Sequence, residues 1–446
     1  MKKAIVLVLA VFVSVPLAFS AIITNTNQST QYLRLLARNA STDIDAVYYN
    51  PAGLTKLADG FHLAVHNETI SQDKTVINSF PFLNNSTYVG TVRIPIYPNI
   101  YAVYKQGPLA FSLGFGPNGG GGTADFKTGL PSFEWLYSAY PWIFTHIYGI
   151  PTSQYSLNMQ FKGDSTYYGF QANVSYAFAD YVSAAIGIRY ITADNEYTGS
   201  ITNIMFNFGG GATMYPGTLL NPGFGDMKVN TSQKGTGFTP ILGLNLTPVE
   251  GLNIGMHYEF KTKLELTNTV ATDDNSGIFP DGQKTRADIP AILALGVSYA
   301  VIPQLRAHLS YTLTFDKDAV WGVEDATGAV ADVDNRALLI NSNCYDLAFG
   351  LEYDVADFLT LSAGYMLTSY NLKPEYQSDL SFALGANTFG FGAQLHVIPK
   401  LTIDLAALIV NYKDAQQTLD YGIFGPAVEK YQETTWAFGI GVGYRF

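Results

Sequence analysis

Cysteine, charge and long apolar runs are all scarce in this sequence. Cys344 is the only cysteine among 446 residues, which excludes an internal disulfide and a lipid-modified N-terminal cysteine. Charged residues make up 14% of the chain, against roughly 25% in ordinary soluble domains. Beyond residue 20, no run approaches the roughly 18 apolar residues that a membrane-spanning helix needs. The composition therefore argues against both a soluble multidomain protein and a helical membrane protein.

Motifs of enzymes, metal sites and nucleotide sites are also missing. The six histidines and one cysteine form no H-E-x-x-H motif and no metal-ligand cluster. The glycine run at 119–122 lacks the Lys-Ser/Thr pair of a phosphate-binding loop, and no Ser, His and Asp spacing suggests a catalytic assembly. The net charge is -11 with no basic stripe. We therefore predict no enzymatic activity, no cofactor, no metal and no nucleic-acid partner.

The N-terminus has the pattern of a secretory signal. Lys2 and Lys3 precede an apolar segment at 4–13, and Ala18-Phe19-Ser20 is a small-x-small cleavage site. The apolar segment is too short for a transmembrane anchor, and no stop-transfer flank follows it. We expect residues 1–20 to be a signal peptide that is removed during secretion.

The strongest pattern after the signal is period-two alternation of apolar and polar or small residues. It is clear at 252–260 and 305–315, and it recurs at 182–190, 359–367 and 401–409. Alternation of this kind indicates strands with one apolar face. Runs of about ten residues fit a strand that crosses a bilayer at a tilt, whereas strands of soluble sandwiches are usually shorter.

Short and long connections alternate along the chain. Short turns are expected around 106–107, 179–180, 248–251, 301–303, 355–356 and 398–399, and long loops at 71–96, 117–165, 193–235, 265–289, 316–342, 371–383 and 412–434. This layout is typical of an even-stranded membrane barrel with long outer loops and short periplasmic turns. We predict an all-β transmembrane antiparallel β-barrel of about 14 strands over residues 59–446.

The last strand supports location in the outer membrane of a Gram-negative cell. Trp436, Phe438, Ile440, Val442, Tyr444 and Phe446 alternate with small residues. A terminal phenylalanine on such a strand resembles the signal that the outer-membrane assembly machinery reads. The expected partners are therefore this machinery, the lipid bilayer and lipopolysaccharide.

The segment 21–58 does not alternate. Leu33, Leu35 and Leu36 have helix-like spacing, and the apolar residues of the segment would be badly exposed in a free periplasmic tail. Fourteen strands enclose more space than their side chains fill, so the lumen needs further contents. We interpret 21–58 as an N-terminal hatch, or plug, inside the barrel; a periplasmic tail is the alternative.

The stretch 39–53, NASTDIDAVYYNPAG, resembles the hatch signature of the FadL/TodX family of outer-membrane transporters for long-chain fatty acids and other hydrophobic compounds. Weaker similarity continues at 98–104, 115–119 and 288–299. The resemblance implies a plugged fourteen-stranded barrel, capture of ligand among the outer loops, a lumen pocket, and lateral release at a kink in the third strand. Asn50, Pro51 and Ala52 match the hatch motif and are predicted to take part in gating; a simple Asn-Pro turn is the alternative.

The kink is expected at the end of the third predicted strand. Gly114, Gly116 and Pro117 lie there, and glycine and proline interrupt a sheet ladder. A fatty carboxylate would need a cation, and Arg93, Lys105, Arg189, Arg286 and Arg306 are candidates. Arg306 and His308 are interpreted as lumen-stabilising residues.

Ligand capture is predicted on an apolar outer loop at 133–148. Its candidate ligand-binding residues are Phe133, Trp135, Leu136, Trp142 and Phe144, with Ile204 and Phe206 of the next long loop as the opposite wall. Exposed apolar patches generally mark binding, although an aromatic girdle or a loop packed on its neighbours would give the same composition. The predicted function is passive uptake of fatty acids or other hydrophobic small molecules; a general porin and a surface adhesin are the alternatives.

Overall fold

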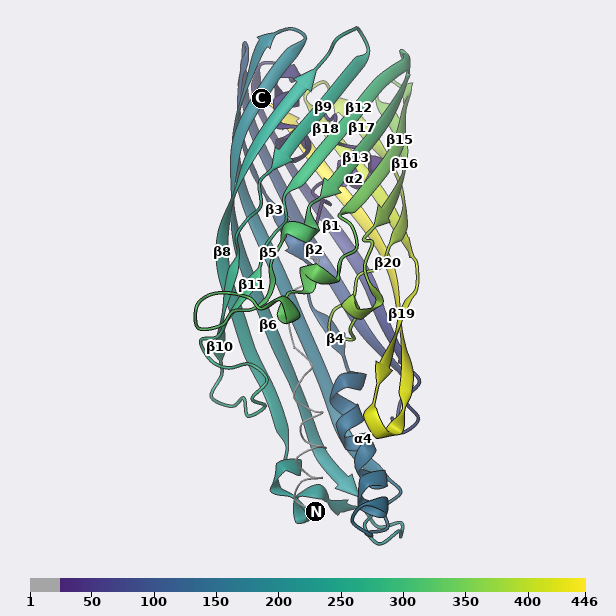
Figure 1. Cartoon of the computed structure of the whole chain (residues 1–446). Coiled ribbons are helices and arrows are strands. Elements are labelled where there is room, and N and C mark those ends of the chain that lie inside the picture. The colour runs from purple at the N-terminus through teal and green to yellow at the C-terminus, as the bar shows by residue number, and fades with distance from the viewer. Residues whose placement is uncertain (1–24) are drawn as a thin grey trace.

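The computed structural model describes residues 25–446, so the predicted signal peptide lies outside the described residues. These residues form one antiparallel sheet that closes into a barrel (Figure 1). The sheet is closed because β1 (Gly60–Asn78) pairs with β2 (Thr87–Gln106) on one side and with β20 (Pro426–Arg445) on the other. Fourteen strands form the wall, which confirms the predicted fold class.

The remaining wall strands follow β2 in chain order, with small strands inserted in the connections. They are β3 (Leu109–Gly120), β5 (Tyr155–Ala179), β6 (Val182–Phe206), β8 (Met227–Leu246), β9 (Leu252–Glu259), β12 (Ile292–Ile302), β13 (Leu305–Thr314), β15 (Cys344–Ala356), β16 (Leu359–Ser369), β17 (Ala386–Ile398) and β18 (Leu401–Tyr412). The small strands are β4 (Ala124–Phe126), β7 (Tyr215–Pro216), β10 (Glu265–Val270), β11 (Lys284–Ala287), β14 (Trp321–Val323) and β19 (Ala415–Asp420).

The two ends of the barrel differ. One end carries the tight turns and the C-terminus; we call it the turn end. The other, the loop end, carries the helix α4 (Pro131–His146) and short 3-10 helices (Figure 1): η2 (Gly217–Leu219), η3 (Pro222–Phe224), η4 (Asp316–Asp318), η5 (Asp332–Asp334), η6 (Arg336–Leu339), η7 (Pro374–Tyr376) and η8 (Gly422–Phe424). Among residues 25–446, no helix is long and apolar enough to cross a membrane.

Two features of the loop end differ from the sequence prediction. The loops predicted at 71–96 and 193–235 are much shorter, because β1, β2, β6 and β8 continue far into them and β6 alone has 25 residues. Strand segments beyond a bilayer need no apolar outer face, so alternation fades although the ladder continues. The predicted loop at 133–148 is also wrong as a loop, since most of it is α4.

Alternation along the wall strands separates two surfaces. Ile186, Phe238 and Phe438 point outward and are more than half exposed. Polar residues such as Arg189 and Glu352 point inward and are buried. The outer belt is thus apolar and the lumen polar, as expected for strands that cross lipid.

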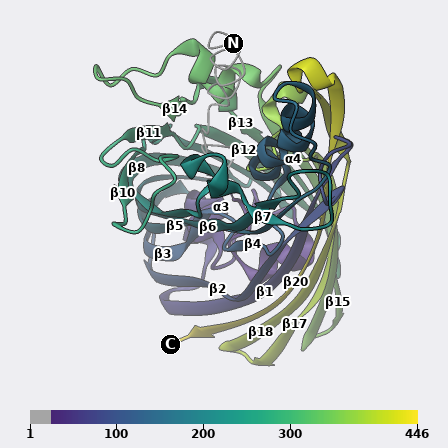
Figure 2. The same cartoon turned by 90° about the horizontal axis from the view of Figure 1, so that it is seen from below.

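The N-terminal segment fills the turn-end half of the lumen. It contains α2 (Thr30–Leu35), α3 (Ala46–Tyr49) and η1 (Pro51–Lys56), and Figure 2 shows α3 within the ring of strands. The Ser29 side chain caps α2 by accepting a hydrogen bond from the Tyr32 backbone N–H. Asn50 leaves the helical region before Pro51, so α3 ends and η1 begins with proline at its first turn. We call residues 25–56 the plug.

Lumen-facing glycines let the plug backbone lie against the wall. A Cβ at Gly364 of β16 would lie 1.9 Å from the Leu35 carbonyl oxygen, and one at Gly390 of β17 would lie 2.1 Å from the Leu33 carbonyl oxygen. Contacts this short leave no room for a side chain. The plug backbone can therefore lie directly on β16 and β17, because glycine leaves these positions without side chains.

A methyl group at this seat should displace the plug. We expect Gly364→Ala to lower the free energy of unfolding by about 1–3 kcal/mol, the usual cost of overpacking a filled interior. Gly163→Ala on β5 is the matched control, because its Cβ would meet its nearest neighbour at an ordinary 3.6 Å. Urea unfolding of the protein in lipid vesicles measures both. Equal stability of the two variants would contradict the seating of the plug on Gly364.

Candidate functional site

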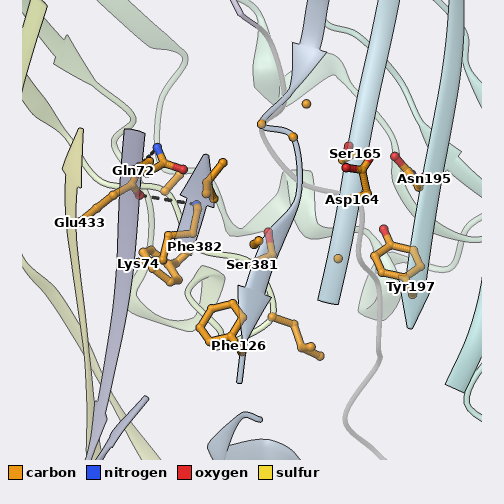
Figure 3. Close-up of a pocket in the computed structure, with 18 of the residues that line it drawn as sticks. Gln72, Lys74, Phe126, Asp164, Ser165, Asn195, Tyr197, Ser381, Phe382 and Glu433 are labelled. Atoms are coloured by element: carbon orange, nitrogen blue, oxygen red, sulfur yellow. Dashed lines mark hydrogen bonds and ion pairs between the residues drawn. The ribbon is translucent and has the colours of Figure 1, made fainter. Parts of the chain in front are cut away.

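A cavity of about 350 Å³ opens on the loop side of the lumen (Figure 3). Gln72, Lys74 and Glu433 lie on one side of it, on β1 and β20, and Asp164 and Tyr197 lie across from them on β5 and β6. Gln72 donates a hydrogen bond to Glu433, whose carboxylate is 3.6 Å from the Lys74 ammonium. We call this space the loop-side cavity.

A second cavity of about 270 Å³, the plug-side cavity, lies directly against the plug. Asn25, Thr26, Asn27 and Tyr32 of the plug form its floor. Its apolar wall comes from Ile70, Met366, Leu408, Val410 and Ala437. The two cavities share the lining residues Asn25, Gln72, Val92, Gly120, Gly121, Tyr370, Leu384 and Tyr412, so they form one passage from the loop end to the plug.

The wall is interrupted beside this passage. Pairing of β2 with β3 stops at Ile100 and Phe115, and this edge of β2 is paired again only where Val92 meets Ala124 of β4, while the other edge stays paired with β1. Pro95 and Pro98 in the intervening part of β2, and Pro117 in β3, have no N–H group to donate to a ladder. We call the region between 93–99 of β2 and 116–123 the wall break. On its other side, β3 stays paired with β5 through a bulge after Pro117.

The start of the plug covers the wall break from inside. The Asn25 N–H donates to the Asn118 carbonyl at 3.2 Å, and the Gln28 side chain donates to the Pro117 carbonyl. The Tyr97 hydroxyl donates to the same Pro117 oxygen at 3.1 Å. A Cβ at Gly116 would lie 2.1 Å from the Asn99 Oδ1 atom and 2.7 Å from the Gln28 Oε1 atom, so glycine lets these two side chains lie against β3. Hydrogen bonds between neutral groups thus hold the plug against the break.

Buried polar side chains cluster behind the wall break. His66 and Glu68 on β1 and Asn99 on β2 are at most 1% exposed. Both ring nitrogens of His66, both polar side-chain atoms of Asn99 and one Glu68 oxygen have no hydrogen-bond partner; the other Glu68 oxygen accepts a bond from Asn27. Sequence reasoning missed this cluster, although alternation on β1 could have placed His66 and Glu68 on the lumen face.

Ion pairs hold the opposite side of the plug. Arg34 of α2 donates to Glu352 of β15 at 2.7 Å and to Asp404 of β18 at 3.0 Å, and all three side chains are buried. Arg38 binds Asp45 within the plug at 2.7 Å. Burial opposes ionisation of Asp45, but the Arg38 guanidinium and hydrogen bonds lower its pKa below the usual value.

All five cations proposed as carboxylate partners are already in ion pairs. Their N–O distances are 2.7 Å for Arg93–Asp73 and Lys105–Asp59, 2.6 Å for Arg189–Glu259 and Arg286–Asp288, and 2.9 Å for Arg306–Asp354. Arg306 and His308 both also approach Glu352, at 3.5 and 3.1 Å. This arrangement agrees with the interpretation of Arg306 and His308 as lumen-stabilising residues.

The fold of this chain is also found among solved structures. The fold matches that of a Pseudomonas aeruginosa FadL homologue with a TM-score of 0.67 at 15% identity, over 96% of this chain and 100% of that one. The chain has the FadL/TodX fold. The toluene transporter TodX of Pseudomonas putida matches this fold with a TM-score of 0.61 at 12% identity, over 96% of this chain and 100% of that one. The toluene transporter TbuX of Ralstonia pickettii matches it with a TM-score of 0.56 at 17% identity, over 91% of this chain and 94% of that one. No protein-family model and no curated protein sequence matches the chain.

Within the FadL/TodX fold, the predicted hatch residues bind the wall. The Asn50 side chain donates to the Ser41 carbonyl at 3.0 Å and to Asn245 of β8 at 2.7 Å. The carbonyls of Pro51 and Ala52 accept hydrogen bonds from Ser175 and Ser183, at 2.7 and 2.8 Å. These three residues therefore lie against β5, β6 and β8 and not at the wall break.

The predicted third-strand residues do lie at the wall break or beside it. Gly116 and Pro117 contact the start of the plug, as described above. A Cβ at Gly114 would lie 2.9 Å from Val47 of α3. The structure thus brings all three of these residues against the plug.

The predicted capture residues gather around α4. Phe144 packs edge-on against Phe206 with ring centroids 5.4 Å apart, and Ile204 belongs to the same buried cluster. Trp135 and Trp142 contact Tyr421 and Phe424, at 5.3 and 5.2 Å. Phe133 and Leu136 border this cluster, and the Phe133 ring also packs on Phe161, which lines the loop-side cavity. The apolar side chains mostly cover one another, and we call this cluster around α4 the aromatic cap; it borders the loop-side cavity through Phe161.

Proposed function

We propose that this protein is an outer-membrane channel for the passive uptake of hydrophobic small molecules. The observation that carries the proposal is the passage that runs from the loop end to the wall break while the plug fills the lumen below it. The FadL/TodX fold supports it, since solved structures with this fold include transporters of toluene. The apolar outer belt supports placement in a membrane.

Entry would begin at the aromatic cap. Phe133, Trp135, Leu136 and Trp142 of α4 are half-buried, so a hydrophobic molecule could exchange contacts with them at little cost in exposed apolar surface. Phe133 reaches toward the loop-side cavity, which makes α4 the link between the cap and the passage. Phe144, Ile204 and Phe206 would form the rigid base on which this surface moves.

Release would occur sideways through the wall break. Below the plug-side cavity, buried ion pairs and close glycine contacts oppose passage along the barrel axis. At the wall break, the barrier is a few hydrogen bonds made by Asn25, Gln28 and Tyr97. A small shift of the first plug residues would open a route from an apolar cavity into the apolar part of the bilayer. Entry into the bilayer lowers the free energy of a hydrophobic molecule.

Uptake into cells tests this proposal. We expect a Gram-negative host that lacks a channel of this fold to accumulate radiolabelled toluene or oleate several-fold faster when it produces this protein than with vector alone. Heat-modifiable migration in gel electrophoresis verifies that the barrel is folded in the membrane. Unchanged uptake of both compounds by cells with folded protein would contradict the proposal.

A further inference from the structure

The plug-side cavity has carboxyl groups but no basic side chain among its described lining residues. Asp316, from η4, and Asp346, from β15, both line it. The Asp346 carboxylate accepts a hydrogen bond from Thr368 at 2.6 Å, and it is only partly buried. One side of the cavity is therefore acidic, whereas the other side is apolar.

Asp316 is the more unusual of the two acids. It is fully buried, and neither of its carboxyl oxygens has a hydrogen-bond partner. A buried carboxyl group without partners is unfavourable unless something else occupies its hydrogen-bonding positions. Burial has the largest effect on the pKa of Asp316 and raises it to about 6, although the neighbouring Cys344 acts in the opposite direction through its thiol and backbone N–H. Since Asp316 lines the cavity, a molecule in the cavity is the available partner.

The approach to this cavity has the same charge character. Asp164, Asp379 and Glu433 line the loop-side cavity, and Lys74 is the one basic residue among its described lining residues. Lys74 lies 3.6 Å from Glu433 and 4.9 Å from the centre of the Phe382 ring, so its charge is already engaged. An anion would therefore meet repulsion along the passage, and no unpaired described cation would hold it at the end.

From this geometry we infer that the channel takes hydrophobic molecules that carry a hydrogen-bond donor, an amine or a hydroxyl group, and that it discriminates against fatty carboxylates. The donor binds Asp316 and Asp346, and the hydrocarbon part lies along Met366, Leu408 and Val410. This inference rests on the proposed function and names the substrate class of the same passage. An ionised carboxyl group accepts hydrogen bonds and donates none, so beside Asp316 and Asp346 the carboxylate of a fatty acid is the disfavoured end group.

A ligand series of constant chain length tests the inference. The full-length protein in nanodiscs is incubated with decane, 1-decanol, decylamine or decanoate, and the retained ligand is quantified by mass spectrometry against empty nanodiscs. We expect decylamine and 1-decanol to be retained with at least about tenfold higher affinity than decanoate, since hydrogen bonds to charged groups are worth this much. Decane should fall between the two groups.

Substitution of the two acids tests which residues are responsible. In the double variant Asp316→Asn, Asp346→Asn we expect the affinity for decylamine to fall about tenfold and the preference over decanoate to disappear. Asp318→Asn is the matched control, because Asp318 is exposed and does not line the cavity. If the double variant does not fold, the wild-type series still decides the question.

The outcomes are distinct. Decanoate binding as tightly as decylamine and decanol in the wild type would overturn the inference and leave the proposed function standing. Preference for donors that persists in the folded double variant would overturn the assignment to Asp316 and Asp346. Retention of none of the four ligands above empty nanodiscs would overturn the proposed function as well.

Discussion

A disulfide that joins the start of the plug to β3 is expected to reduce uptake by about tenfold or more, because it removes the open state of the wall break from the population. Asn25→Cys with Asn118→Cys is the suitable pair, since the Asn25 N–H donates to the Asn118 carbonyl at 3.2 Å and the two backbones are therefore adjacent. The pair is introduced with Cys344→Ser so that the buried native thiol cannot compete.

The effect of the disulfide should be reversible. Uptake of the radiolabelled ligand is measured in oxidised cells and again after addition of dithiothreitol, which should restore the original rate. Each single cysteine variant serves as a control and should transport at the rate of Cys344→Ser. Full uptake in the oxidised double variant would mean that release does not require the plug to part from β3.

The fold was predictable because alternation is a local property. Segments such as 252–260 and 305–315 show an apolar face residue by residue, and the tight turns between them set the number of strands. The outer parts of β1, β2, β6 and β8 could not be found in this way. Their neighbours hold them by backbone pairing, and their buried apolar side chains, such as Val76, Tyr88 and Tyr197, belong to loop-end clusters and do not continue the apolar outer face.

Helix α4 was missed for a related reason. Its aromatic residues surround the helix, so they show no clear 3.6-residue period. Its packing partners Phe206, Phe224 and Phe424 lie at the end of β6, on η3 and on η8, and their convergence depends on the closed barrel.

The candidate site was only partly predictable. Gly114, Gly116 and Pro117 marked one edge of the wall break, because glycine and proline disrupt a ladder whatever surrounds them. The other edge depends on Pro95 and Pro98 of β2, which lie in a predicted loop and in a fragment with weak family similarity. The acids Asp316 and Asp346 are thirty positions apart and converge only because β13 and β15 are neighbours.

The two sides of the plug are held by different interactions. Near the wall break, Asn25, Gln28 and Tyr97 use hydrogen bonds between neutral groups, which contribute little net stability each and can be exchanged for water. On the far side, Arg34 is buried between carboxylates of β15 and β18. A plug held in this way can shift at its first residues and stay fixed elsewhere, so the wall break can open without opening the barrel axis.

Removal of the Arg34 side chain should therefore have the largest effect on how well the plug blocks the route along the barrel axis. Arg34→Ala leaves Glu352 and Asp404 buried without their main counter-ion, and breaking a buried pair in this way costs about 3–5 kcal/mol. The two acids would draw water into the lumen, and the plug would separate from β15–β18. We expect steady ion conductance in planar bilayers that the wild-type protein lacks.

The matched control is Lys228→Ala, which removes a lysine–aspartate pair with Asp273 whose side chains are 51% and 48% exposed and which lies away from the wall break. An exposed pair contributes about 1 kcal/mol or less, so this variant should remain closed. Closed channels in both variants would show that the plug does not depend on Arg34. Steady conductance in the wild type itself would favour the general porin, because an ion path would then exist while every anchor of the plug is intact.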